Sequence, residues 1–422
     1  MPTLKGVEYL REKLRYKKPR VKVRYKYYEM KQIVRDLNIS TPPDLRYWMG
    51  SLGWCSRAVD ALADRLVFRE FENDNFRMNE IYNLNNRDIL IDSAILGALI
   101  TSCDFIYITA DDDGFPRMRV IDGSHATGII DPITNMLTEG YAVIDFDDRD
   151  NAITEAYFIP GHTIIYQNGR IMSDIPNAAP YPLLVPIINR PDAKRPFGHS
   201  RISRACMSLV NSAIRTAKRS EIASEFFSYP QKYILGMSPD AETMDKWKAT
   251  MSSMLRIDQD ENGGHPVVGQ FQAASMAPHT EQLRMFAGLF AGETGLTLDD
   301  LGFPSQNPSS AESIKASHEA LRLTARKAQN TISVGLINAG YLAACVRDNT
   351  PYLRSEIYRT RAKWEPIFEP DAAMLSSIGD GAIKINQAVP GYFDHAVLRD
   401  ITGIEGGEMP ENLFAINTEG EE

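Results

Sequence analysis

The chain has 422 residues, of which 43% are hydrophobic and 24% charged, and its formal net charge is −9. A chain of this length can bury a hydrophobic core without disulfides or metals, and it has room for about two to four domains. The acidic balance argues against tight, static binding of nucleic acid, because neutralisation of phosphates dominates that affinity. It does not argue against a protein that lets DNA pass without gripping it.

Three features of the whole chain concern location. The four cysteines lie far apart and form no CxxC pair, which is typical of a reducing, intracellular context: they are Cys55, Cys103, Cys206 and Cys345. No run approaches about 18 consecutive apolar residues, so no membrane span is predicted. The N-terminus has no apolar signal core after its charged residues, so secretion is not expected.

The N-terminal segment is basic. Residues 3–17 predict a short amphipathic helix, and the run of lysines and arginines continues to Lys26. Such a segment either contacts nucleic acid or an acidic partner, or it is a solvated arm, and a charge run by itself favours the arm.

Helical and strand periods follow in turn. Residues 53–71 predict a helix that passes into a strand, and residues 86–101 a second helix. The period then changes to two, which predicts antiparallel strands with hairpin turns at Asp113-Gly114 and Asn168-Gly169. The strands are expected at 105–109, 117–121, 141–146, 152–159 and 163–166, and an apolar run at 181–188 ends the region.

Two acidic clusters lie at predicted strand ends. One is Asp111-Asp112-Asp113, and the other consists of Asp145, Asp147, Asp148 and Asp150. Carboxylate oxygens are ligands for Ca²⁺ or Mg²⁺, but neither cluster completes an EF-hand loop. Aspartate is also a common turn residue, because its side chain bonds nearby backbone groups, and this interpretation is favoured.

Long helices mark the second half of the chain. Residues 200–228 predict a helix that stops before Pro230, since the residue before a proline resists the helical conformation. The insert at 231–276 has two extended pieces, at 233–236 and 266–271, with a helical stretch around Met244 and Trp247 between them. Pro278 then opens another helix, which a loop punctuated by glycine and proline follows at 298–308.

A further long helix begins with a capping box formed by Ser309 and Glu312 and extends to Arg347. Its apolar stripe is accompanied by Gly335 and Gly340, which let another helix approach closely. The rest of the chain predicts a strand at 357–364 and short helices at 371–388 and 392–402. The expected fold class is therefore α+β.

Sequence signals for catalysis are missing. The chain has no phosphate-binding GxxxxGK[ST] loop, no HExxH, no GxSxG and no paired CxxC. Its seven histidines are scattered singly, and a lone histidine is usually a satisfied surface or core residue. No catalytic residue, metal site or cofactor is predicted, and the chain is not expected to be an enzyme.

The order of several short motifs resembles the portal proteins of tailed double-stranded DNA bacteriophages, specifically the SPP1 Gp6-like portal family. The resemblance covers some 350 residues and rests on this order rather than on any single motif. The motifs are Val185-Pro186-Ile187, Gly198-His199-Ser200-Arg201-Ile202, Glu225-Phe226-Phe227-Ser228-Tyr229-Pro230, Leu301-Gly302 with Asn307-Pro308-Ser309-Ser310-Ala311-Glu312, and Trp364-Glu365-Pro366.

The resemblance implies a portal fold with a β-rich wing, a helical stem, a small α/β clip, a tunnel loop and a short helical crown. The wing corresponds to residues 1–198, the stem helices to 199–228 and 277–298, the clip to 229–276, the tunnel loop to 299–312, the long wing helix with its return strand to 313–369, and the crown to 370–422.

The resemblance also implies three groups of site residues. The tunnel loop would face DNA through Gly302, Phe303, Ser305, Gln306, Asn307 and Ser309. Basic residues of the channel or of the contact between subunits would be Arg204, Arg215, Lys218, Arg219, Lys315, Arg322 and Arg326. Clip residues that meet the packaging and tail proteins would be Trp247, Lys248, Asp258, Asp260 and Glu261.

A portal of this family implies a ring of about twelve subunits at one capsid vertex. The ring passes double-stranded DNA without sequence preference during genome packaging and ejection. Its other partners would be the large terminase subunit, the head–tail adaptor, and the major capsid and scaffolding proteins, with no membrane. It would be assembled in the host cytoplasm and reside in the virion. Two alternatives stay open: another ring-forming virion adaptor, and a metal-dependent DNA-processing enzyme that uses the aspartate clusters.

Overall fold

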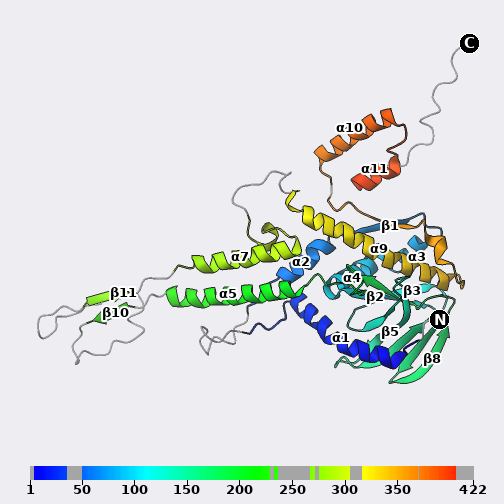
Figure 1. Cartoon of the computed structure of the whole chain (residues 1–422), viewed down its shortest axis with the longest axis horizontal. Helices are drawn as coiled ribbons and strands as arrows, with labels where there is room; N and C mark the ends of the chain where they lie inside the picture. Colours follow the sequence, from blue (N-terminus) through cyan, green and yellow to red (C-terminus); the bar gives the residue numbers. More distant parts are fainter. Residues whose placement is uncertain are drawn as a thin grey trace, which may run out of the picture. The chain divides into compact units, whose positions relative to one another are not determined.

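The computed structural model describes residues 4–35, 50–228, 232–235, 267–270, 275–304, 316–368 and 370–404. The chain divides into two compact units (Figure 1). The first unit comprises Met1–Tyr25, Ala58–Ile202 and His318–Glu422, and the second comprises Lys26–Arg57 and Ser203–Ser317. Helices and strands are mixed, which confirms the α+β class at this level.

The first unit contains a five-stranded antiparallel sheet and a three-stranded antiparallel sheet. The larger sheet has the order β4-β5-β6-β7-β8, with β4 at Ala126–Ile130, β5 at Leu137–Phe146, β6 at Ala152–Ile159, β7 at His162–Gln167 and β8 at Arg170–Pro176. The smaller sheet has the order β3-β2-β9, with β2 at Cys103–Ala110, β3 at Pro116–Ile121 and β9 at Leu184–Ile188.

The five strands predicted from the two-residue period are confirmed, whereas β4, β8 and β9 were not predicted as strands. The apolar run at 181–188 contains Pro186, which argues against a central strand. The structure resolves this conflict because β9 lies at the edge of its sheet, where a proline need not donate to a neighbour.

Helix α9 (Glu319–Arg347) is the central helix of the first unit, and its predicted apolar stripe is buried. The stripe consists of Leu321, Ala325, Ala328, Ile332, Leu336 and Ala339. A side chain at Gly340 would lie 2.6 Å from the Met78 sulfur of helix α3 (Met78–Leu84), so the expected close approach of another helix is confirmed. Gly335 approaches strand β9 instead, because its closest neighbours are Pro186 and Ile187. Helix α4 (Arg87–Thr101), which follows α3, matches the predicted helix at 86–101.

The first unit also pairs two strands that are distant in sequence. Strand β1 (Phe68–Glu72) lies antiparallel to β12 (Arg361–Trp364). The prediction of a strand over 357–364 is wrong at its start, because a 3-10 helix, η3 (Arg354–Ile357), precedes the strand. The Glu356 side chain accepts the Leu353 N–H at 3.3 Å, which closes this turn and buries Ile357.

The two predicted C-terminal helices are present as α10 (Ala372–Ala388) and α11 (His395–Thr402). Each begins at an aspartate whose carboxylate accepts a backbone N–H of the first turn, Asp371 in α10 and Asp394 in α11. Asp400 of α11 is paired with Arg69 of β1 and with Lys363 of β12. These ion pairs attach α11 to the β1–β12 pair.

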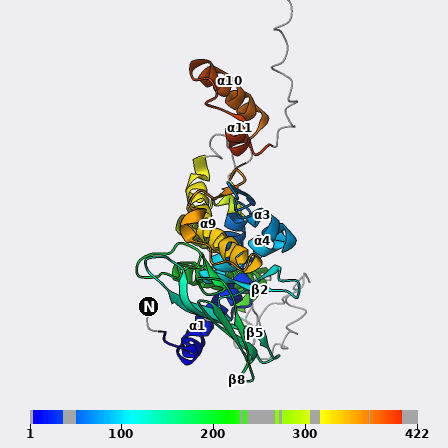
Figure 2. The same ribbon diagram turned by 90° about the vertical axis from the view of Figure 1, so that its right-hand side faces the viewer.

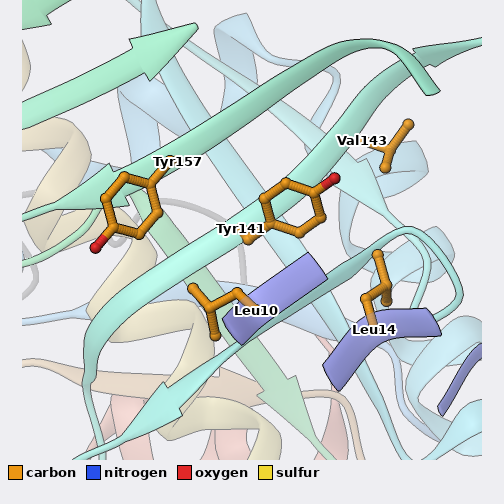
Figure 3. Close-up of a cluster of buried hydrophobic side chains, with 5 residues drawn as sticks. All are labelled: Leu10, Leu14, Tyr141, Val143 and Tyr157. Atoms are coloured by element: carbon orange, nitrogen blue, oxygen red, sulfur yellow. The ribbon is translucent and has the colours of Figure 1, made fainter. Parts of the chain in front are cut away.

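Helix α1 (Val7–Tyr28) is longer than predicted and continues through Pro19. Within the first unit it lies on one face of the five-stranded sheet (Figures 1 and 2). Leu10 and Leu14 are buried against side chains of β5 and β6, as Figure 3 shows. The interpretation of the basic segment as a solvated arm is therefore wrong for this part of it, because two leucines one turn apart anchor it to the sheet.

A buried carboxyl group of the first unit, that of Asp104, has a raised pKa. Asp104 of β2 is 2% exposed, and it accepts hydrogen bonds from Thr101 Oγ1 at 2.9 Å and from the Gly123 N–H at 3.0 Å. Burial, together with the neighbouring charge of Asp122, raises the pKa of Asp104 to about 8, although both hydrogen bonds oppose the rise. The side chain is therefore protonated in the folded protein at neutral pH.

This carboxylate predicts how stability depends on pH. The folded state keeps a proton on Asp104 that the unfolded chain loses above about pH 4, so this contribution to stability falls as pH rises towards 8, by about 1.4 kcal/mol per pH unit. Asp104→Asn should remove this decline. We expect the variant to gain stability over the wild type as urea unfolding is moved from pH 5 to pH 8. Parallel pH profiles for the two proteins would contradict the assignment.

The second unit is built on two antiparallel helices, α5 (Arg204–Ser228) and α7 (Ala277–Thr294), which lie side by side in Figure 1. Both were predicted, and the apolar faces of α5 and α7 are buried where expected, at Cys206, Val210 and Ala213 and at Ala287 and Phe290. The two extended pieces of the insert form an antiparallel pair, β10 (Lys232–Leu235) with β11 (Val267–Gln270). Trp54, at the start of α2 (Trp54–Ala63), packs on Phe290 with ring centroids 5.7 Å apart.

Candidate functional site

The first residues of the predicted tunnel loop form a compact turn. Helix α7 ends at Thr294 with Gly295 as its C-cap, and a 3-10 turn, η2 (Asp299–Leu301), follows. The Asp300 carboxylate accepts hydrogen bonds from both the backbone N–H and the hydroxyl of Thr297, at 3.0 and 2.9 Å, and lies 3.4 Å from the Arg57 guanidinium. The loop therefore starts from a fixed point in the second unit.

Gly302 directs the chain out of this turn. Its φ of +87° lies in the left-handed region, and its surroundings leave open space where a side chain would be. Gly302 is exposed and Phe303 is half-buried. The other predicted loop residues, Ser305, Gln306, Asn307 and Ser309, lie outside the described residues, as does the predicted capping box.

The basic residues predicted on α5 differ in exposure. Arg204 is exposed, and Arg215 and Arg219 are half-buried. Arg215 donates a hydrogen bond to Ser212 at 3.0 Å. Lys218 is only 5% exposed within the chain. A role for Lys218 in a channel or in a contact between subunits stays a prediction.

Two of the basic residues predicted near the long helix, Arg322 and Arg326, belong to the first unit. Arg322 donates two hydrogen bonds to Glu319, both at 2.7 Å, so a carboxylate one turn away neutralises much of its charge. Arg326 is exposed on the same helix. Lys315 lies outside the described residues, as do the five predicted clip residues Trp247, Lys248, Asp258, Asp260 and Glu261.

The aspartate clusters serve as turn acceptors, as the favoured interpretation predicted. Asp111 accepts the N–H groups of Asp113 and Phe115 and pairs with Arg117 at 2.9 Å. Asp147 accepts the N–H of Asn151 at 2.8 Å in the second cluster. In the ranges that the structure describes, no group of three or more His, Cys, Asp or Glu side chains is arranged to hold a metal ion. No helix in those ranges combines the length and apolar character needed to cross a membrane.

The sequence analysis missed a polar contact that joins α1 to the five-stranded sheet. Two glutamates point from the strands towards α1 and are nearly inaccessible: Glu139 is 1% exposed and Glu155 8% exposed. Glu139 accepts the N–H groups of Lys5 and Gly6 at the start of α1, at 2.7 and 3.0 Å. Glu155 pairs with Arg11, so part of the basic segment contacts acidic side chains of its own chain.

A histidine, His125, lies beside another contact between α1 and this part of the first unit, the pair of Lys18 with Asp150. His125 bridges Asp122 at 2.6 Å and Asp150 at 2.7 Å, and its ring is stacked on Phe146. The hydrogen bond to Asp122 raises the pKa of His125, and the bond to Asp150 adds to the rise although burial opposes it. Asp150 also pairs with Lys18 of α1 at 2.8 Å. For His125, the expectation of a satisfied lone histidine is confirmed.

Two curated proteins are similar to the chain in sequence. The portal protein of Mycobacterium phage L5 is 24% identical over 323 residues, and the portal protein of Mycobacterium phage D29 is 23% identical over 320 residues. Each alignment covers 70% of this chain and 65% of the relative, so the match spans slightly less than two thirds of each relative's length. No protein-family model matches the chain.

Solved structures with a partial likeness come from gene transfer agent particles. A chain in a structure described as the virion of the native particle has a TM-score of 0.45 at 12% identity, with 84% of this chain and 90% of that chain covered. A chain in the neck of the empty particle, computed with C6 symmetry, has a TM-score of 0.47 at 13% identity, with 87% and 96% covered.

The two sequence matches confirm the resemblance to portal proteins, although they do not single out the Gp6-like division of that family. The chain is thus a distant sequence relative of bacteriophage portal proteins.

Proposed function

We propose that the chain is the subunit of a portal ring of about twelve copies, set at one vertex of a phage capsid. The ring is the channel through which the genome is packaged and ejected, and it docks the terminase and then the head–tail adaptor. The observation that carries the proposal is the sequence match to two portal proteins over 70% of the chain. No catalytic step is proposed.

The parts of the chain are assigned accordingly. The second unit supplies the stem through α5 and α7, the clip through the segment that contains β10 and β11, and the start of the tunnel loop through the turn at Asp300. The sheets and α9 of the first unit form the wing, and α10 and α11 begin the crown. These boundaries follow the family resemblance, and the helix pair and the strand pair support them.

A DNA conduit must not grip its cargo. Each additional phosphate contact adds salt-sensitive affinity that opposes sliding. The net charge of −9 limits such attraction, and the tunnel-loop residues Ser305, Gln306 and Asn307 offer neutral hydrogen-bonding groups to phosphate oxygens. Contacts to the backbone of DNA carry no sequence information, so we expect passage of DNA without base preference.

Electron microscopy of the purified chain tests this proposal. Negative-stain images should show rings with an axial hole, and mass photometry should give a mass close to twelve chains. A monomer that cleaves DNA in the presence of Mg²⁺ would overturn the portal and favour a DNA-processing enzyme. Rings that connect the head of the virion to its tail, but are not needed for packaging, would favour an adaptor.

Removal of the tunnel loop is expected to separate assembly from DNA handling. Deletion of residues 302–307 removes the N–H groups of Gly302 and Phe303 that bond the Asp299 and Leu298 carbonyls, but it keeps the hydrogen bonds between Asp300 and Thr297. Rings should therefore stay intact. Packaging or retention of DNA should fall severely. Measurement of ring yield and of packaged DNA in a phage or particle assay checks both parts.

A variant of unchanged length serves as the control for this deletion. Replacing Ser305, Gln306 and Asn307 with alanine keeps the loop length and removes its polar groups. If the loop acts by narrowing the channel, this variant should package DNA normally. If the loop acts through hydrogen bonds to phosphates, the variant should be as defective as the deletion. Loss of ring assembly in the deletion would contradict a tunnel-loop role for this segment.

A further inference from the structure

The two halves of α1 differ in how they are attached to the first unit. Leu10 and Leu14 are the buried residues of this helix, and both lie before Pro19. Proline has no N–H to donate to the carbonyl of Arg15, so the helix is weakest at this point. In the second half of α1 (residues 20–28) every side chain that the structure describes is exposed or half-buried. The ion pairs next to Pro19 therefore contribute more to the attachment of this half.

One carboxylate, that of Asp150, receives two lysines of α1. Lys18 pairs with it at 2.8 Å, and Lys22 pairs with its other oxygen. Lys18 also donates to the backbone carbonyl of Asp150 at 3.3 Å. Asp150 lies in the turn between β5 and β6, and its φ of +63° is in the left-handed region that glycine adopts more readily. What an aspartate adds at this position is the acceptor for the two lysines.

Asp150 is fixed in turn by His125, which precedes β4. Nε2 of His125 lies 2.7 Å from the Asp150 carboxylate, and Nδ1 lies 2.6 Å from that of Asp122. The backbone carbonyl of His125 accepts the Val143 N–H at 2.7 Å, and its ring is stacked on Phe146. With its side chain 12% exposed, His125 is a fixed bridge between the β3–β4 turn and the Asp150 turn (residues 147–151).

This bridge requires a proton on each ring nitrogen. A carboxylate can only accept, and a neutral imidazole has one N–H and one lone pair, so only the charged ring can donate to both Asp122 and Asp150. The hydrogen bond to Asp122 contributes most to the raised pKa of His125. The neutral ring is therefore expected to keep its bond to Asp122 and to turn a lone pair towards Asp150, which repels the carboxylate.

We propose that the second proton of His125 clamps the second half of α1 to the first unit. With this proton, His125 holds Asp150 in place, and Asp150 holds Lys18 and Lys22. Without it, the Asp150 turn separates from the β3–β4 turn and the second half of α1 loosens, while the first half stays on the sheet. The clamp lies within one copy of the chain and does not depend on the portal assignment.

The groups that face His125 determine the pH at which the clamp opens. The hydrogen bond to Asp122 raises the pKa of His125, burial and the charge of Lys18 lower it, and Asp150 raises it, so the folded value lies above the ordinary value of about 6.5. The clamp is therefore closed below about pH 6.5 and opens as pH rises through the folded pKa. Other charged groups act through these partners: Lys22 and Asp147 lie beside Asp150, and Asp104 lies near Asp122.

Hydrogen exchange of the full chain, measured by mass spectrometry between pH 5.5 and pH 9, tests the clamp. After correction for the intrinsic pH dependence of exchange, the protection of residues 20–28 and of the Asp150 turn should fall about fivefold or more as pH rises. Residues 7–17 should keep their protection, because Leu10 and Leu14 stay buried. Protection of residues 20–28 that does not change with pH would overturn the clamp.

Two variants assign the transition to the histidine. His125→Gln can donate one hydrogen bond but carries no charge, so residues 20–28 should show the low protection of the wild type at pH 9 at every pH. Asp104→Asn is the matched control, because Asp104 also titrates near pH 8 but bonds Thr101 and Gly123. This control should keep the transition in α1. A transition that persists in His125→Gln would assign it to another group and contradict the proposal.

Lysine variants separate the clamp from a merely structural turn. Lys18→Met removes a charge that lowers the pKa of His125, so the transition of the Asp150 turn should move to higher pH, while residues 20–28 are loosened at every pH. Lys26→Met, at an exposed position of the same helix, should do neither. Should His125→Gln fail to fold, Asp150→Asn should give the loosened helix at every pH, since asparagine tolerates the left-handed conformation. An unshifted transition in Lys18→Met, or a pH-dependent α1 in Asp150→Asn, would overturn the clamp.

Discussion

Replacing Arg11 with methionine is expected to lower the free energy of unfolding of the first unit by about 2–4 kcal/mol, because the change leaves a buried carboxylate without its cation. The Glu155 side chain is 10% exposed and that of Arg11 is 24% exposed, so water screens the pair only weakly. Methionine keeps much of the apolar stem of the arginine, so the loss reflects the charge and its hydrogen bonds rather than packing.

The geometry shows why this pair matters more than others on the surface. Arg11 Nε donates to Glu155 at 3.1 Å, a second guanidinium nitrogen pairs with the other carboxylate oxygen, and the Tyr141 hydroxyl donates to the same glutamate. Burial alone would lower the pKa of Arg11, yet the hydrogen bonds and charge of Glu155 raise it above its ordinary value. The arginine therefore stays charged in the folded protein.

Urea unfolding and hydrogen exchange of β5 and β6 check this prediction. Glu8→Gln is the matched control, because Glu8 also pairs with Arg11 but its side chain is 80% exposed, and such surface pairs contribute about 0–1 kcal/mol. Arg11→Met combined with Glu155→Gln should recover most of the loss, since a neutral amide can still accept the tyrosine hydrogen bond. Equal, small effects of Arg11→Met and Glu8→Gln would show that α1 is not held by this pair.

The docking of α1 also shows where sequence reasoning reached its limit. The helical period around Leu10 and Leu14 indicated a helix, but nothing local indicated what covers its apolar side. Glu155 and Tyr157 are two residues apart on a strand and so share a face, which the alternation rule predicts. Which face is covered, and by a segment 144 residues away in the case of Arg11 and Glu155, depends on tertiary packing that no short window contains.

In the rest of the fold, too, local sequence predicted the helices, whereas tertiary packing decided which residues are buried or lie at an edge. Long apolar stripes predicted α4, α5, α7 and α9, because a helix that buries one face imposes a period on many residues. Strand β9 was missed because its apolar run contains Pro182 and Pro186, which oppose a central strand, and the sheet order shows that β9 is an edge. On α5, the charge of Lys218 argued for the surface, whereas the packing of the second unit buries it.

For the candidate site, the sequence predicted the helix that precedes the loop and the glycine that follows the turn, but not the turn itself. A single aspartate, Asp300, holds Thr297 and faces Arg57, which is more than 240 residues away. Composition can suggest that a segment is a polar loop that contains glycine and proline. It cannot show that the first residues of the loop are held by side-chain contacts.

Gly198→Ala is expected to destabilise the first unit strongly, by about 4 kcal/mol, which is near the upper end for single substitutions. Gly198 has a φ of +73°, where an L side chain is strained, and a Cβ there would lie 2.1 Å from the Asn189 carbonyl oxygen. That carbonyl cannot easily move, because it accepts the His199 N–H at 2.8 Å while the Asn189 side chain donates to the His199 carbonyl at 2.7 Å.

Gly114→Ala separates the clash from the backbone strain. Gly114 has a φ of +80°, but a Cβ at this position would meet no atom within 4 Å, so its replacement should cost only the strain of the left-handed conformation, about 1–2 kcal/mol. The difference between the two variants in urea unfolding measures the contact with Asn189. Since Gly198 opens the segment that leads into α5, a loss confined to this contact would explain why a glycine begins the motif Gly198-His199-Ser200-Arg201-Ile202. Equal losses in the two variants would show instead that only the backbone conformation requires glycine there.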